Sequence, residues 1–168
     1  MAETDASGGL EELYARYVPG AVRLSFLLTG DRQRAEDLAQ EAFVRCVGRF
    51  RHLRAQEAFE AYLRRTIVNL HTSGLRRRRL ERAWLANEGA TQASRTSSLP
   101  DVGEREDLWR EMAALPPRQR AALVLRYYED LSEHETAAVL GCSVAAVKSL
   151  VARGTEALRT TVTRGEEL

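Results

Sequence analysis

Arginine side chains gather in one stretch of this sequence and give it the chemistry of an anion-binding surface. Residues 51–85 hold nine arginines against three acidic residues, and the run Arg76, Arg77, Arg78 and Arg79 lies near the end of that stretch. A guanidinium keeps its charge and binds phosphate through two parallel hydrogen bonds. The run therefore predicts a phosphate-binding segment, with a merely solvated charge run as the alternative.

The residues just before this run predict contact with bases as well as with phosphates. Arg64, Arg65, Val68 and Thr72 share the predicted helix face opposite the apolar one, and Asn69 lies at its border. Arginine attracts phosphate, and an asparagine amide can bond two atoms on one base edge. We expect this face to bind nucleic acid.

A second set of candidate residues follows a short helix and a tight turn near the end of the sequence. Ser132 and Glu135 form a capping box at the start of the short helix. Gly141 can take the left-handed conformation that ends a helix, and Ser143 can cap the next one. Short helix, glycine turn and capped second helix are typical of a helix-turn-helix, although any tight helical hairpin gives the same pattern.

The second helix of this motif has an apolar seam and a face suited to a DNA groove. Val144, Val147, Val151, Gly154 and Leu158 form the seam. On the outward face Ala145, Ala146, Ser149 and Arg153 are small or basic, which permits close approach to base edges, and Lys148 flanks this face. The candidate DNA-binding residues are Ser143, Ala145, Ala146, Lys148, Ser149 and Arg153.

Apolar spacing predicts the helices that must position these groups, and no stretch alternates as a strand would. One helix runs over 10–28, with a break or bend at Pro19-Gly20, and Asp31 can cap the next, over 31–50. With a third helix from Phe59 they can close a three-helix bundle. The second helix also carries an outward polar face around one valine: Asp37, Gln40, Glu41 and Val44.

A change in composition divides the sequence in two. From Asn87 to Gly103 it is rich in Gly, Ser, Thr and Pro, which favours a flexible linker over an ordered loop. We therefore expect an all-α protein with a helical domain over 10–84, a linker over 85–103 and a helix-turn-helix domain over 104–162.

Composition excludes several other classes of protein. The chain has 168 residues, a net charge of +1 and 44% hydrophobic residues, which suits one or two small soluble domains. Cys46 and Cys142 lack metal-ligand spacing, and His52, His71 and His134 have no partner pattern, so we expect no metal, no cofactor and boundary or surface positions for the histidines. We find no catalytic constellation, no membrane span and no targeting segment, which favours the cytoplasm.

Three segments in order resemble the extracytoplasmic-function (ECF) sigma factors of the sigma-70 family. DRQRAEDLAQEAFVRCVGRF resembles the family's polymerase-binding helix, and AYLRRTIVNLHTSGLRRRR resembles the segment that melts and reads the −10 promoter element. LPPRQRAALVLRYYEDLSEHETAAVLGCSVAAVKSLVARGTEALR resembles the family's C-terminal domain, which reads the −35 element. Length and order are most similar to the compact actinobacterial sigma-E group.

The resemblance implies a function for each face. Asp37, Gln40, Glu41 and Val44 would contact core RNA polymerase, Arg64 to Arg79 the −10 region of promoter DNA, and the recognition helix the −35 element. An anti-sigma protein would be a further partner. Ala146 and Leu150 stand where the family commonly has Thr and Arg, so the resemblance leaves the promoter sequence open.

Other classes of protein stay open at this point. A stand-alone helix-turn-helix regulator would leave the N-terminal helices unexplained. A decoy that binds polymerase without reading DNA is a third possibility, and an enzyme has the least support.

Overall fold

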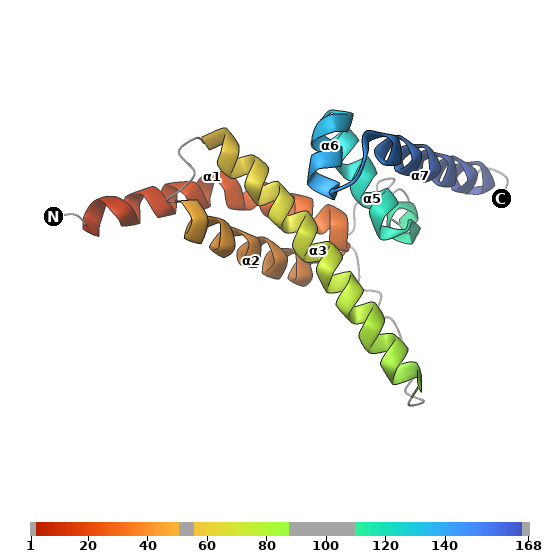
Figure 1. Ribbon diagram of the computed structural model, residues 1–168, viewed down its shortest axis with the longest axis horizontal. Coiled ribbons are helices and arrows are strands. Elements are labelled where there is room, and N and C mark those ends of the chain that lie inside the picture. Colours follow the sequence, from red (N-terminus) through yellow and green to blue (C-terminus); the bar gives the residue numbers. More distant parts are fainter. Residues whose placement is uncertain (1–2, 51–55, 88–109, 166–168) are drawn as a thin grey trace.

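The computed structural model describes residues 3–50, 56–87 and 110–165, and within these ranges every regular element is helical (Figure 1). The elements are α1 (Glu3–Thr29), α2 (Arg32–Phe50), α3 (Gln56–Asn87), α5 (Pro117–Leu123), η1 (Val124–Tyr128), α6 (Glu133–Leu140) and α7 (Val144–Gly165). Residues 110–114 form a further helical turn before α5. The expectation of an all-α fold is confirmed.

Helices α1, α2 and α3 form the predicted N-terminal bundle. Gly30 directly follows α1 and has a φ of 67°. The Asp31 carboxylate accepts a 3.0 Å hydrogen bond from the Arg34 amide, as expected of an N-cap. Phe43 of α2 and Phe59 of α3 meet edge to face, with ring centroids 6.0 Å apart. The apolar seams found in the sequence therefore close the core of this bundle.

The sequence predicted a break or a bend at Pro19-Gly20, and a break there is wrong, because α1 continues through both residues. Pro19 lies on the exposed side of α1, whereas Val18 and Ala21 are buried in the core on either side of it. Packing of the buried face holds the helix together where the proline removes one backbone hydrogen bond.

The C-terminal part contains the predicted helix-turn-helix. After α5 the chain widens into one π-helical turn, in which the Glu129 amide donates to the Val124 carbonyl at 3.0 Å. Helices α6 and α7 are then bent by 97° relative to each other. Gly154 of α7 lies against Leu123 of α5, where an added Cβ would come within 2.9 Å of the leucine side chain, so glycine permits this close packing.

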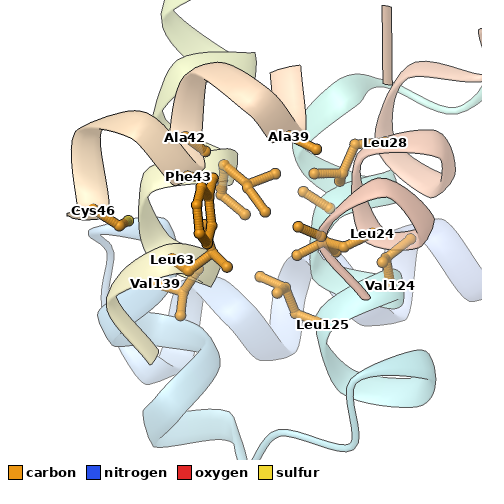
Figure 2. Packing of buried hydrophobic residues seen from close by; sticks show 14 of the residues in the cluster. Leu24, Leu28, Ala39, Ala42, Phe43, Cys46, Leu63, Val124, Leu125 and Val139 are labelled. Carbon is orange, nitrogen blue, oxygen red and sulfur yellow. The ribbon is translucent and has the colours of Figure 1, made fainter. Parts of the chain in front are cut away.

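The two parts of the chain pack against each other and share one hydrophobic cluster. Figure 2 shows Leu24, Leu28 and Leu63 from the N-terminal bundle in one cluster with Val124, Leu125 and Val139 from the C-terminal part. The Arg120 guanidinium also donates a 2.9 Å hydrogen bond to the Leu28 carbonyl in the last turn of α1. The sequence predicted two domains, but it gave no sign of this contact between them.

Most of the predicted linker, residues 88–103, lies outside the described residues. Its first residues, 85–87, belong to α3, which continues past the domain boundary expected at residue 84. Within the described part of the chain, no single helix is long and apolar enough to cross a membrane. Only α6 and α7 taken together, across their 97° bend, reach that length and hydropathy.

Candidate nucleic-acid interface

A groove of about 1160 Å³ lies between α2 and α3, and its walls are rich in arginine. Six arginines line it, against the two acidic residues Asp37 and Glu41. Asn69 and Arg65 of α3 are both exposed and line it too. The arginines are Arg34, Arg45, Arg49, Arg65, Arg77 and Arg78. This excess of positive charge beside an exposed amide suits a polyanion that presents hydrogen-bonding edges.

The structure separates the residues that the sequence placed on one outward face of α3. Arg65 and Asn69 are exposed, as expected, but Val68 is only 2% exposed, so the prediction of an outward Val68 is wrong. Thr72 is half-buried, and its hydroxyl donates a 2.8 Å hydrogen bond to the Val68 carbonyl. Val68 belongs to the hydrophobic cluster that also contains Leu125 and Val139 of the C-terminal part. Helix α6 packs against α3, so α3 has a second buried face.

Arg64 lies on this second face rather than in the groove. Its side chain is 16% exposed and forms ion pairs with Glu129 at 2.7 Å and with Glu60 at 3.2 Å. Two carboxylates therefore hold a guanidinium for which the sequence predicted a phosphate.

The arginine run is also divided between two environments. Arg76, Arg77 and Arg79 are exposed on the half of α3 that extends beyond the bundle. Arg78 is half-buried and donates to the Gly74 carbonyl at 3.4 Å. Burial lowers the pKa of Arg78, and the nearby charge of Arg34 lowers it further. Arg77 also lies 3.8 Å from the Glu81 carboxylate of the next turn. Three of the four side chains are thus accessible from solvent, and one of these has an acidic neighbour.

The outward face of α2 has the predicted form. Val44 is 70% exposed, and Asp37, Gln40 and Glu41 around it are exposed as well. Glu41 pairs with Arg45 of the next turn at 2.7 Å. A lone apolar side chain ringed by polar groups matches the centre and rim of a protein-binding surface.

The helix-turn-helix has the expected local geometry. The Ser132 hydroxyl accepts from the Glu135 amide at 3.2 Å, and the Glu135 carboxylate accepts from the Ser132 amide at 2.7 Å, which completes the capping box. Hydrogen bonding to Ser132 lowers the pKa of Glu135. Gly141 has φ of 62°, and the Ser143 hydroxyl accepts from the Ala146 amide at 3.1 Å.

The turn fixes the orientation of the next helix, α7. Ala146 is half-buried. The other candidate DNA-binding residues, on α7 and just before it, are exposed: Ser143, Ala145, Lys148, Ser149 and Arg153. Lys148 lies 3.7 Å from the Glu133 carboxylate, so one of the two predicted cations on this helix has an acidic neighbour. Val147 of the seam is fully buried.

His71 was expected at a boundary or on the surface, and this expectation is wrong. Its side chain is 7% exposed. Burial, with the nearby charges of Arg120, Arg78 and Arg34, lowers its pKa from 6.5 to about 4. His134 is exposed, and His52 lies outside the described residues.

His71 follows the buried Ile67 by four residues, so helical spacing alone could have placed it in the core. Cys46 is buried, and within the described residues no cluster of His, Cys, Asp or Glu could hold a metal ion.

Two family models match the chain in the order that the sequence predicted. The family described as sigma-70 region 2 matches residues 13–81, and the family described as sigma-70, region 4 matches residues 105–158. Both matches fall on the helical parts that carry the surfaces above.

Curated relatives match over most of the chain. It is 38% identical to the RNA polymerase sigma-E factor of Streptomyces avermitilis over 132 residues. This match covers 79% of this chain and 73% of that protein. It is 33% identical to the ECF RNA polymerase sigma factor SigE of Mycolicibacterium smegmatis over 156 residues. That match covers 89% of this chain and 60% of that protein.

A solved structure shares the fold. The sigma factor RpoE from Bartonella quintana, determined in complex with the anti-sigma factor NepR, matches with a TM-score of 0.71 at 21% identity and covers 91% of this chain and 96% of that one. With both sigma-70 regions matched in order and sigma-E factors among its relatives, the chain belongs to the ECF sigma factors of the sigma-70 family, of the sigma-E type.

Proposed function

We propose that the chain binds core RNA polymerase through α2 and promoter DNA through α3 and α7. In this proposal Asp37, Gln40, Glu41 and Val44 contact polymerase, and the groove with the exposed part of the arginine run contacts the −10 element. The outward face of α7 contacts the −35 element. Residues 10–84 form the first functional unit, and residues 104–162 form the second.

The groove between α2 and α3 is the observation that carries this proposal. Asp37 and Glu41, which belong to the outward face of α2, also line one wall of the groove, and Arg65 and Asn69 line the other. A polymerase bound to α2 would therefore lie directly beside DNA bound in the groove. This adjacency is what a factor that joins polymerase to one promoter segment requires.

Three further features belong to this proposal. The chain acts by binding and carries no catalytic site of its own, and it works in the cytoplasm, where polymerase and promoter DNA are found. An anti-sigma protein controls its access to polymerase. Support for that partner is the sigma factor of Bartonella quintana, whose solved complex contains one.

Run-off transcription with purified core RNA polymerase tests the proposal. We expect the chain to confer initiation at specific promoters, with transcripts that begin downstream of paired −35 and −10 elements. A stand-alone helix-turn-helix regulator would bind duplex DNA without polymerase and confer no initiation. A decoy would bind polymerase and also confer none, so either result contradicts the proposal.

A further inference from the structure

The second half of α3 extends away from the bundle and carries two large apolar side chains in the open. The last buried side chain of α3 is His71, and Figure 1 shows the helix continuing well beyond the ends of α1 and α2. Leu80 and Trp84 on this extension are each 67% exposed. Single exposed apolar side chains are common on protein surfaces, so a contact for Trp84 has to be argued from the residues around it.

Helical spacing places Trp84 on the same face as the groove. Asn69, Ser73 and Arg77, which line the groove, are followed at intervals of three and four residues by Leu80 and Trp84. At 1.5 Å per residue, Asn69 and Trp84 stand roughly 22 Å apart along the helix axis. A ligand that leaves the groove along α3 would pass over Arg77 and Leu80 before it reaches Trp84.

The charge around Trp84 identifies the kind of ligand. Arg76, Arg77, Arg79 and Arg82 are exposed on this extension, and Glu81 is the one acidic residue among residues 72–86. This charge disfavours a second copy of the same helix, because like charges would meet. An aromatic side chain within a positively charged surface is how proteins hold single-stranded nucleic acid, with the ring stacked on a base and the cations on the backbone.

We propose that Trp84 stacks on an unpaired base of promoter DNA, as a second contact point beyond the groove. The inference rests on the proposed function, in which α3 binds the −10 region. At 3.4 Å per stacked nucleotide, the separation from Asn69 corresponds to about six nucleotides. Arg76, Arg77 and Arg79 hold the backbone between the two contacts, and Trp84 fixes how far the unpaired strand extends along α3.

Binding of single-stranded oligonucleotides to the reconstituted holoenzyme tests this inference. The probe is an unpaired DNA strand that carries the −10 sequence and extends about eight nucleotides past it on either side. We expect Trp84→Ala to weaken binding about five- to a hundred-fold, the range for loss of one base stack. Trp84→Phe keeps an aromatic ring and should retain most of the affinity. Leu80→Ala is the matched control, since it removes an equally exposed apolar side chain that has no aromatic ring.

The variant should also show where on the strand the stack occurs. Shortening the oligonucleotide stepwise from each end should abolish the difference between wild type and Trp84→Ala at one length, about six nucleotides from the base bound at Asn69. Neither the salt dependence of binding nor the affinity for core polymerase should change, because the indole carries no charge and faces DNA.

Four outcomes would overturn the inference. These are an unchanged affinity of Trp84→Ala, an equal loss with Leu80→Ala, an equal loss on fully paired DNA, or a loss of affinity for core polymerase. Asn69→Ala separates this failure from failure of the proposed function. If Asn69→Ala weakens binding and Trp84→Ala does not, the groove binds DNA and the stack is wrong. If neither variant weakens binding, the proposed role of α3 is wrong as well.

Discussion

The Arg64 guanidinium donates a 2.7 Å hydrogen bond to the Glu129 carboxylate, and this contact joins α3 to the residue that directly follows η1. Both side chains are 16% exposed. Arg64 is one of the residues that the sequence assigns to promoter DNA. In this conformation the Arg64 guanidinium is paired with the carboxylate of Glu129, from the C-terminal part of the chain. DNA can therefore bind Arg64 only after this ion pair has broken.

The first prediction concerns this ion pair. Glu129→Gln should lower the free energy of unfolding by about 1–3 kcal/mol, because Arg64 keeps its charge in a partly dehydrated place and loses its shorter contact. Urea unfolding of the full chain measures the change. Glu60→Gln is the matched control, since Glu60 is the more exposed partner of the same arginine, and it should cost about 0–1 kcal/mol. Equal losses from the two variants would contradict the prediction.

The second prediction concerns His71, whose pKa burial lowers from 6.5 to about 4. The unfolded chain binds a proton at this site near pH 6.5, whereas the folded chain does so only near pH 4. Stability should therefore fall as the pH drops from about 6.5 to about 4, by at most about 3 kcal/mol from this group.

Unfolding measured at several pH values tests the contribution of His71. His71→Gln, which cannot take up the proton, should make the stability curve flatter across this window. His134→Gln replaces an exposed histidine and should leave the slope unchanged. A His71→Gln curve parallel to that of the wild type would show that His71 is not the responsible group.

Features that depend on neighbours in the sequence could be predicted, and those that depend on the other half of the chain could not. The capping box of Ser132 and Glu135 and the cap at Asp31 form within three residues, so the sequence contains all that determines them. Ile67 and Val68 are both apolar and both buried, but the sequence pattern placed Val68 on the outward face. Val68 is buried in a cluster that includes Leu125 and Val139 from the other half of the chain, which no local pattern indicates.

The candidate surfaces divide in the same way. Val44 and Arg153 could be recognised as outward because their helices have one clear apolar seam each. Arg64 lies on a helix with two buried faces, and its partner Glu129 is 65 residues away in the sequence. Trp84 follows the groove residues in register, but its exposure depends on how far α3 extends beyond the bundle, which composition alone does not fix.

The third prediction concerns the outward face of α2. Asp37→Arg combined with Glu41→Arg reverses its charge while leaving the buried side of the helix intact. We expect core polymerase no longer to co-purify with this variant, and the helical content by circular dichroism to be unchanged. Glu12→Arg, at an exposed position on α1, is the control and should co-purify normally. A folded double variant that still binds polymerase would rule out this face.

The fourth prediction concerns the recognition helix. Arg153 is an exposed cation on the outward side of α7. Arg153→Ala should weaken binding to the −35 element by on the order of 1–3 kcal/mol if the guanidinium meets a base, and by less if it meets phosphate. A series of single base substitutions distinguishes the two, because only a base contact changes the sequence preference. Arg23→Ala on α1 is the control, and an equal effect from it would remove Arg153 from the interface.

The fifth prediction concerns the arginine run, of which three side chains are exposed and one is half-buried. Each phosphate that the run neutralises releases counterions, which makes binding depend on salt. Changing Arg76, Arg77 and Arg79 together to Ala should make the log–log salt slope of promoter binding shallower by about 2 to 3, since each lost contact accounts for about 0.7 to 0.9. Preference among promoters should change little, because phosphate contacts carry no sequence information.

The matched control changes Arg16, Arg23 and Arg32 together to Ala, because it removes the same charge from exposed side chains that do not line the groove. Its salt slope should stay close to that of the wild type. Parallel slopes for the triple variant of the run and for the wild type would mean that the run is only solvated charge. A slope as shallow for this control as for the triple variant of the run would mean that net charge, rather than contact with phosphates, sets the salt dependence.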